Sequence, residues 1–177
     1  MMKNVKWIET PVGMLKAVEE DGFLTELDFA RKAEAAPCSN DSAIEEPCSS
    51  SSAAAELCSN DSAVLMETER QLRDYFSGKR KSFDLPIRTE GTAFQKAVWD
   101  ALLAIPYGEA RTYGEIAAAV GKPGAARAVG TACHDNPISI VIPCHRVLGA
   151  GDRLNGYGGG LANKARLLDL EGASYRK

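Results

Sequence analysis

The fold of the C-terminal half is decided by the stretch TYGEIAAAVGKPGAARAVGTA, residues 112–132. Gly and Pro at 121–124 separate two segments of helical composition, so the sequence predicts short helices at 112–120 and 125–132. Two helices joined by such a turn are typical of a helix-turn-helix, although any tight helical hairpin has the same pattern. The stretch therefore favours a DNA-binding unit and leaves a purely structural hairpin open.

The second of these helices consists almost entirely of Ala, Gly and Val, and Arg127 is its single long side chain. Such a helix has no polar set with which to read base edges in the major groove. It can approach DNA closely in the minor groove and direct one arginine toward the base stack. The alternative is tight packing of a small-residue helix, with Arg127 in a salt bridge.

Farther along the chain, the hexapeptide Ile142-Pro143-Cys144-His145-Arg146-Val147 places a cysteine beside one of only two histidines. A thiol with a pKa of about 8.5 is mostly protonated at neutral pH, so a nucleophilic cysteine needs a base or positive charge nearby. Adjacent residues on an extended chain point to opposite faces, so we expect a bridging water between Cys144 and His145. The alternative is a structural cysteine at the end of a buried strand formed by the apolar run 138–142.

The remaining C-terminal segments predict two more helices and a glycine-rich loop. Thr92 is the expected N-cap of a helix through Ile105, and a last helix covers 162–170. The loop 155–160, Asn-Gly-Tyr-Gly-Gly-Gly, lacks the Gly-Lys-Ser/Thr ending of a phosphate-binding P-loop, which disfavours nucleotide hydrolysis.

The N-terminal half predicts an antiparallel meander of three strands at 5–10, 14–19 and 23–30, with Asp21-Gly22 as a hairpin turn. Residues 34–67 contain seven acidic residues, no basic ones and a decamer repeated three times, which indicates a mobile acidic insertion. A helix at 65–76 and an edge strand at 83–87 are expected to follow.

Composition indicates a soluble, reduced, cytoplasmic protein of 177 residues. No apolar run is long enough for a signal peptide or a membrane span. The five cysteines include Cys38, Cys48 and Cys58, ten residues apart and without a nearby histidine, which argues against disulfides and a zinc site. The net charge of −3 divides into −6 for residues 1–86 and +3 for residues 87–177, so the C-terminal half is the better candidate for a polyanion.

The motifs described so far stand among several others between residues 113 and 172. They are Tyr113, Ala126-Arg127-Ala128-Val129-Gly130, Asn136-Pro137, Pro143 to Val147, Tyr157-Gly158-Gly159-Gly160, Lys164 and Glu171-Gly172. In order and spacing they resemble the O6-alkylguanine-DNA alkyltransferase family, the methylated-DNA–protein-cysteine methyltransferases, across residues 92–172. The resemblance implies an α/β (α+β) fold: a small N-terminal antiparallel sheet domain with a helix (ribonuclease H-like, residues 1–86), followed by a helix-turn-helix/winged-helix-like C-terminal domain (residues 87–177).

The resemblance also implies that the partner is double-stranded DNA containing O6-alkylguanine. It implies a monomeric protein that needs no cofactor or metal. The protein would flip O6-alkylguanine, and also O4-alkylthymine, out of the duplex and transfer the alkyl group irreversibly to Cys144. The implied catalytic residues are Cys144, His145, Glu171, Asn136 and Tyr113. The implied DNA-binding residues are Arg127, Tyr113, Ala126, Ala128, Gly130 and Thr131. The implied substrate-pocket residues are Val147, Tyr157, Gly158, Gly159, Arg146 and Lys164.

Two residues depart from the family pattern. Gly158 stands where serine is frequent, and Cys133 stands where a larger apolar residue is common, which places a second thiol near the expected pocket wall. Three alternatives stay open at this point: a non-reactive lesion sensor, a helix-turn-helix regulator and a Cys-His hydrolase that turns over repeatedly.

Overall fold

The structure is a computed structural model that describes residues 3–30 and 62–176. Its N-terminal part is a sheet of three antiparallel strands, β1 (Lys3–Thr10), β2 (Gly13–Glu20) and β3 (Phe23–Phe29), in the order β1-β2-β3. Asp21 and Gly22 have φ angles of 53° and 85°, as a two-residue hairpin with the right-handed strand twist requires. The predicted meander and its turn are therefore confirmed.

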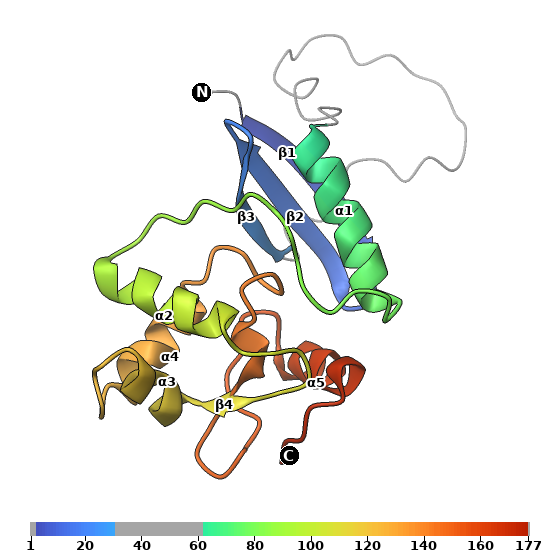
Figure 1. Cartoon of the computed structure of the whole chain (residues 1–177). Coiled ribbons are helices and arrows are strands. Elements are labelled where there is room, and N and C mark those ends of the chain that lie inside the picture. Colours follow the sequence, from blue (N-terminus) through green and yellow to red (C-terminus); the bar gives the residue numbers. More distant parts are fainter. Residues whose placement is uncertain (1–2, 31–61, 177) are drawn as a thin grey trace, which may run out of the picture.

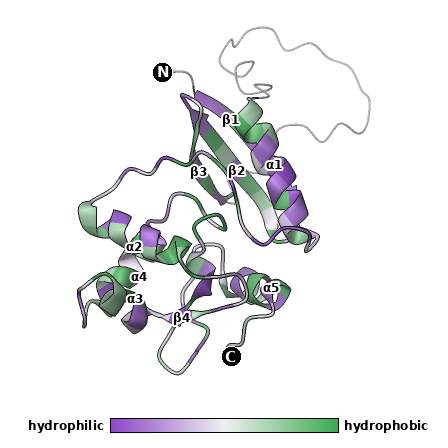
Figure 2. Cartoon of the chain, in the orientation of Figure 1, coloured by the Kyte–Doolittle hydropathy of each residue, from purple (hydrophilic) through white to green (hydrophobic). Residues whose placement is uncertain are grey.

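Helix α1 (Ala63–Phe76) lies across one face of this sheet (Figure 1). The Ser62 side chain caps the helix. Hydrophobic and hydrophilic residues are interspersed along its length, as in an amphipathic helix (Figure 2). The predicted acidic insertion 34–67 falls largely outside the described residues, as do the repeats of Cys38, Cys48 and Cys58. Its predicted end is corrected, because the segment from Ala63 onward is helical and Leu65 is fully buried.

The outer edge of β3 is covered by two loops from later in the chain. At Leu24, the backbone bonds with Pro86 and Arg88 at 2.8 and 3.0 Å; the predicted edge strand at 83–87 is thus reduced to one bridge. At Leu27, the backbone bonds with Pro137 and Ser139 at 2.8 and 2.7 Å. These bonds satisfy the polar groups of an otherwise open strand edge and fix the segment that leads to Cys144 against the sheet.

The C-terminal part contains α2 (Ala93–Leu103), α3 (Tyr113–Ala119), α4 (Ala126–His134) and α5 (Leu161–Glu171). Strands β4 (Arg111–Thr112) and β5 (Val147–Leu148) pair in parallel, and the 3₁₀ turn η2 (Cys144–Arg146) precedes β5. Thr92 and Thr112 form capping boxes with Gln95 and Glu115, which explains where α2 and α3 begin. All four helices lie where the sequence predicts them, within two residues at either end.

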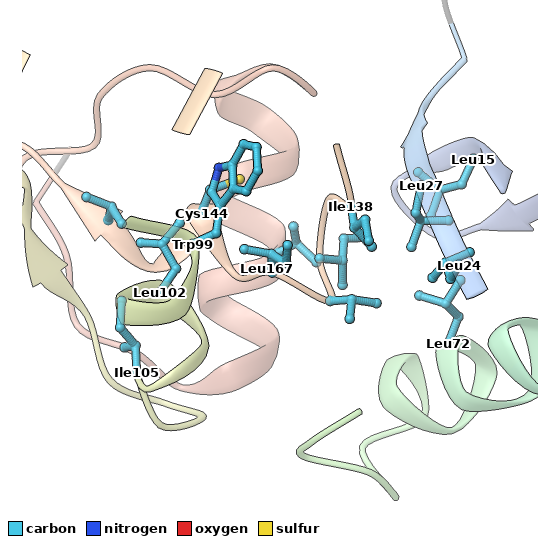
Figure 3. Close-up of a cluster of buried hydrophobic side chains, with 14 of the residues drawn as sticks. Leu15, Leu24, Leu27, Leu72, Trp99, Leu102, Ile105, Ile138, Cys144 and Leu167 are labelled. Carbon is cyan, nitrogen blue, oxygen red and sulfur yellow. The ribbon is translucent and has the colours of Figure 1, made fainter. Parts of the chain in front are cut away.

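One hydrophobic core joins the two parts of the molecule. Leu24 and Leu27 of the sheet, Ile138 of the covering loop and Trp99 of α2 belong to the same buried cluster (Figure 3). Cys144 lies within this cluster rather than on an exposed loop. Among the described residues, the structure contains no helix with the length and hydrophobicity needed to cross a membrane.

Candidate active site

Cys144 begins the 3₁₀ turn η2, and its side chain is held from one side by Asn136. The Asn136 amide donates to Cys144 Sγ at 3.2 Å and to the Ile142 carbonyl at 2.9 Å. Its own carbonyl oxygen accepts from the Ile138 amide at 3.1 Å. One buried side chain therefore fixes both the backbone turn before Cys144 and the position of its sulfur.

The backbone that enters η2 is a sequence of tight turns rather than a strand. The Ile142 amide bonds to the Ile138 carbonyl and the Cys144 amide to the Ile142 carbonyl, while Ile140 has a φ of 73°. A non-glycine residue in this left-handed region is uncommon and is held here by burial. The expectation of an extended chain at Cys144 is wrong, so the argument from opposite strand faces does not apply to Cys144 and His145.

His145 is completely buried and bonds through Nε2 to Glu171 Oε1 at 3.0 Å. Burial lowers the pKa of His145, because the charged imidazolium loses its hydration, while the Glu171 carboxylate opposes the shift. In the neutral ring, Nε2 carries the proton toward Glu171 and Nδ1 is left as an acceptor. Within the described part of the protein, no residue forms a hydrogen bond with Nδ1.

The Glu171 carboxylate is the centre of a buried network. Arg146 donates to both of its oxygens at 2.8 Å, and the Tyr75 hydroxyl donates to Oε1 at 2.6 Å. Burial alone would raise the pKa of Glu171, but the hydrogen bonds from His145, Arg146 and Tyr75 outweigh it and hold the pKa at about 2. Glu171 is therefore ionised at neutral pH, and Arg146 compensates its charge.

Lys164 lies below the glycine-rich loop with its ammonium group out of contact with solvent. It donates to the carbonyls of Val147, Asn155 and Gly156 at 2.6, 2.5 and 3.0 Å. Burial lowers the pKa of Lys164 to about 8. Burial raises the pKa of the Cys144 thiol, and the Asn136 amide and the Lys164 charge act in the opposite direction.

A pocket of about 260 Å³ opens onto the Cys144 side chain. It is lined by Tyr113, Gly130, Cys133, His134, Cys144, Gly156, Tyr157 and Gly158. A second, wider hollow of about 560 Å³ is lined by the start of α3, by residues of α4 that include Arg127, and by the segments 149–150 and 155–156. The two adjoin, because Tyr113, Gly130 and Gly156 line both. Burial raises the pKa of Tyr113 to about 12, so its hydroxyl keeps its proton at neutral pH.

The described residues contain no group of three or more His, Cys, Asp or Glu side chains arranged to hold a metal ion. The reactive groups at the site are the Cys144 thiol, the His145–Glu171 pair and the Tyr113 hydroxyl.

Two family profiles match the chain. The one described as 6-O-methylguanine DNA methyltransferase, DNA binding domain, matches residues 93–173, and the ribonuclease-like domain of the same family matches residues 5–89. The chain belongs to the O6-methylguanine DNA methyltransferase family. Both the resemblance read from the motifs and the predicted fold class are thereby confirmed.

Relatives and solved structures agree with this assignment. The chain is 41% identical over 170 residues to the constitutive methylated-DNA–protein-cysteine methyltransferase of Bacillus subtilis, covering 96% of this chain and 95% of that protein. It is 59% identical over 107 residues to the Methanosarcina acetivorans enzyme of that name, which is 60% of this chain. The matched segments span 69%, 66% and 61% of the lengths of M. acetivorans, M. barkeri and Mycobacterium bovis relatives.

Among solved structures, the O6-methylguanine methyltransferase of Mycobacterium tuberculosis is 41% identical, with a TM-score of 0.77, and the match covers 97% of this chain and 93% of that one. The crystal structure of M. tuberculosis OGT in complex with DNA matches at 40% identity and the same TM-score, over 96% of this chain and 92% of that one.

In this family member, the predicted catalytic residues occupy one continuous region. Asn136 contacts the Cys144 sulfur, His145 and Glu171 form a buried pair beside it, and Tyr113 faces the pocket from the start of α3. Of the predicted DNA-binding residues, Ala126, Arg127 and Gly130 line the wider hollow, and Ala128 and Thr131 are exposed on the same helix.

The predicted pocket residues separate into two groups. Tyr157 and Gly158 line the pocket, as does Cys133, whereas Arg146 and Val147 do not. Their assignment to the pocket is corrected: Arg146 turns toward Glu171, and Val147 is buried in β5. Lys164 acts from beneath, through its three carbonyl contacts. Gly159 faces the sheet, where a Cβ atom would stand 2.5 Å from the Phe29 ring.

Three residues of the site were not predicted. Tyr75 reaches Glu171 from α1, and Phe29 reaches Gly159 and the Tyr157 ring from the end of β3, with 5.7 Å between ring centroids. His134 lines the pocket from the last turn of α4. For Tyr75 and Phe29, no signal in the sequence marks a contact over such a separation; His134 was discoverable as the only other histidine.

Proposed function

We propose that this protein repairs DNA by transferring the alkyl group of O6-alkylguanine to the sulfur of Cys144 in a reaction that each molecule performs once. The observation that carries the proposal is the position of Cys144: its sulfur faces a small pocket, is bonded by Asn136 and lies beside the buried His145–Glu171 pair. The names of its relatives, methylated-DNA–protein-cysteine methyltransferases, support the same chemistry.

The first step is removal of the thiol proton. Because burial raises the pKa of Cys144 and lowers that of His145, both groups are neutral at rest. We infer that His145 accepts the proton at Nδ1, because Nε2 is hydrogen-bonded to Glu171. A water would carry the proton from the sulfur to Nδ1, which has no hydrogen-bond partner among the described residues. Glu171 then stabilises the imidazolium, and Asn136 stabilises the thiolate through its amide.

In the second step, the thiolate attacks the alkyl carbon opposite the guanine O6. The sulfur–carbon bond forms as the carbon–oxygen bond breaks, and the electron pair of the broken bond stays on the guanine. The Tyr113 hydroxyl faces the same pocket and is the donor for the proton that neutralises this leaving group. The same displacement would serve O4-alkylthymine.

The product explains why the reaction is not repeated. The transferred group is bound to Cys144 as a thioether, and none of the described residues around the sulfur offers a means of cleaving it. A thioether sulfur also has no proton to give to His145, so the nucleophile cannot be regenerated by the same route.

Access to the base requires that the nucleotide leave the duplex, because a buried sulfur cannot reach O6 in line with the alkyl carbon inside a base pair. Exposed Arg127 lies beside the wide hollow that adjoins the pocket. We infer that α4 lies in the minor groove, where its small side chains permit close approach and Arg127 fills the gap in the stack.

The test uses a duplex with one O6-methylguanine and compares the wild-type protein with Cys144→Ala. The wild-type protein should restore guanine with a yield of one base per protein molecule, and Cys144→Ala should bind the same duplex without restoring it. Tight binding without repair by the wild-type protein would instead indicate a non-reactive lesion sensor. Repair of many bases per molecule would indicate a hydrolase.

A further inference from the structure

We propose that Tyr75, on helix α1 of the N-terminal part, is a positioning residue that sets the proton affinity of His145 through Glu171. Its hydroxyl donates to Glu171 Oε1 at 2.6 Å, although 96 residues separate the two in sequence. The inference rests on the proposed function, in which His145 takes the proton of Cys144. It connects the N-terminal part to the reacting thiol through Glu171 and His145.

The carboxylate oxygen that Tyr75 contacts is the one that also contacts the histidine. Glu171 Oε1 accepts from Tyr75, from His145 Nε2 at 3.0 Å and from Arg146 Nη2 at 2.8 Å, whereas Oε2 accepts from Arg146 Nε at 2.8 Å. Three donors share the charge of one oxygen. The tyrosine hydroxyl therefore competes with His145 for the electron density that would stabilise an imidazolium.

The hydroxyl of Tyr75 is a permanent donor in this position. Its side chain is fully buried, and burial together with the adjacent Glu171 charge raises its pKa far above neutral. Its ring is fixed by contacts with Phe76, Phe83 and Tyr107, with centroid distances of 5.3, 5.3 and 6.1 Å. Because these contacts belong to the ring, phenylalanine can replace tyrosine and remove the hydroxyl alone.

Charged groups of η2 and α5 act on His145, and the adjacent Cys144 thiol is neutral because burial raises its pKa. Glu171 of α5 raises its pKa, while Arg146 of η2 and Lys164 of α5 lower it. The Tyr157 ring stands edge-on to the imidazole at a centroid distance of 6.5 Å. Each of these groups stays in place when the Tyr75 hydroxyl is removed, so the variant changes one interaction of the network.

Removal of the hydroxyl should raise the pKa of His145. In Tyr75→Phe, Glu171 stays ionised because Arg146 and His145 still donate to it, and Oε1 has one donor fewer. The carboxylate then stabilises the imidazolium more strongly. We expect the midpoint of the His145 titration to move upward by about half a pH unit or more.

The experiment is a pH titration of the histidine side chains by NMR, using the full-length protein. The chain has only two histidines, so His145 and His134 are assigned by recording one spectrum of His134→Gln. The matched control is Tyr107→Phe. The Tyr107 hydroxyl donates to the Leu170 carbonyl at 3.0 Å in the same region and has no contact with the Glu171 carboxylate among the described hydrogen bonds.

An upward shift of His145 in Tyr75→Phe, with His134 unchanged and with no shift of His145 in Tyr107→Phe, would support the assignment. The acidic limb of the methyl-transfer rate should move to higher pH in parallel. Superimposable His145 titrations in Tyr75→Phe and wild type would overturn the assignment, and so would equal shifts in both variants. Absence of transfer by the wild-type protein would refute the proposed function, while the NMR titration would still decide the role of Tyr75.

Discussion

Substitution of Glu171 by Gln should destabilise the protein in a way that depends on pH. Gln keeps the size of the side chain but removes the charge that pairs with Arg146 and polarises His145. The pKa of Glu171 is lowered from 4.5 to about 2, a difference worth about 3 kcal/mol of folding free energy at neutral pH. Breaking a buried ion pair by removing one partner costs a similar amount, about 3–5 kcal/mol.

The sign of the pH dependence follows from the lowered pKa. A carboxylate of this kind contributes its full stabilisation above its ordinary pKa of 4.5 and loses it as the pH falls toward 2. The difference in unfolding free energy between wild type and Glu171→Gln should therefore be about 3 kcal/mol at pH 7 and about half of that at pH 3. Urea unfolding of both proteins at each pH measures it. The same difference at pH 7 and pH 3, or none at pH 7, would refute the reasoning.

Three further predictions concern the loop, the DNA and the base. Gly159→Ala should slow transfer about tenfold or more, because the added Cβ would stand 2.5 Å from the Phe29 ring and displace the pocket loop. In the double variant with Phe29→Ala, much of the rate should return in single-turnover assays. No recovery would exclude this contact as the cause. Arg127→Ala should bind lesion-containing duplex about tenfold more weakly in fluorescence anisotropy, and unchanged affinity would place Arg127 outside the interface. As the pH is lowered, the wild-type transfer rate should fall only below about pH 6.5, because burial lowers the pKa of His145 and a protonated imidazole cannot take the thiol proton. A rate that already decreases above pH 7 as the pH is lowered would contradict this role of His145.

Local signals in the sequence predicted the secondary structure well. Asp21-Gly22 predicted the hairpin because Asp and Gly tolerate the positive φ angles that the turn requires, and Thr92 was the expected N-cap of α2. The structure shows Thr112 capping α3 in the same way. These features depend on residues within four positions of one another. They can therefore be read from sequence without knowledge of the tertiary structure.

The parts that escaped prediction depend on contacts between distant segments. The apolar run 138–142 resembles a strand, but its bonds to the edge of β3 and the Asn136 side chain bend it into turns. Tyr75 has the appearance of an ordinary core residue of an amphipathic helix, and only the fold shows that its hydroxyl meets Glu171. Likewise, Gly159 reads as a flexible loop residue, whereas the structure shows close packing against Phe29.

Alkyl transfer to Cys144 is tested most directly by the intact mass of the protein, with peptide mapping, after reaction with a duplex that contains one O6-methylguanine. We expect the addition of one methyl group, located on the peptide that contains Cys144, with saturation at one per protein molecule and none after incubation with unmodified DNA. An unchanged mass after the duplex has been bound, or a methyl group on any other residue, would contradict it.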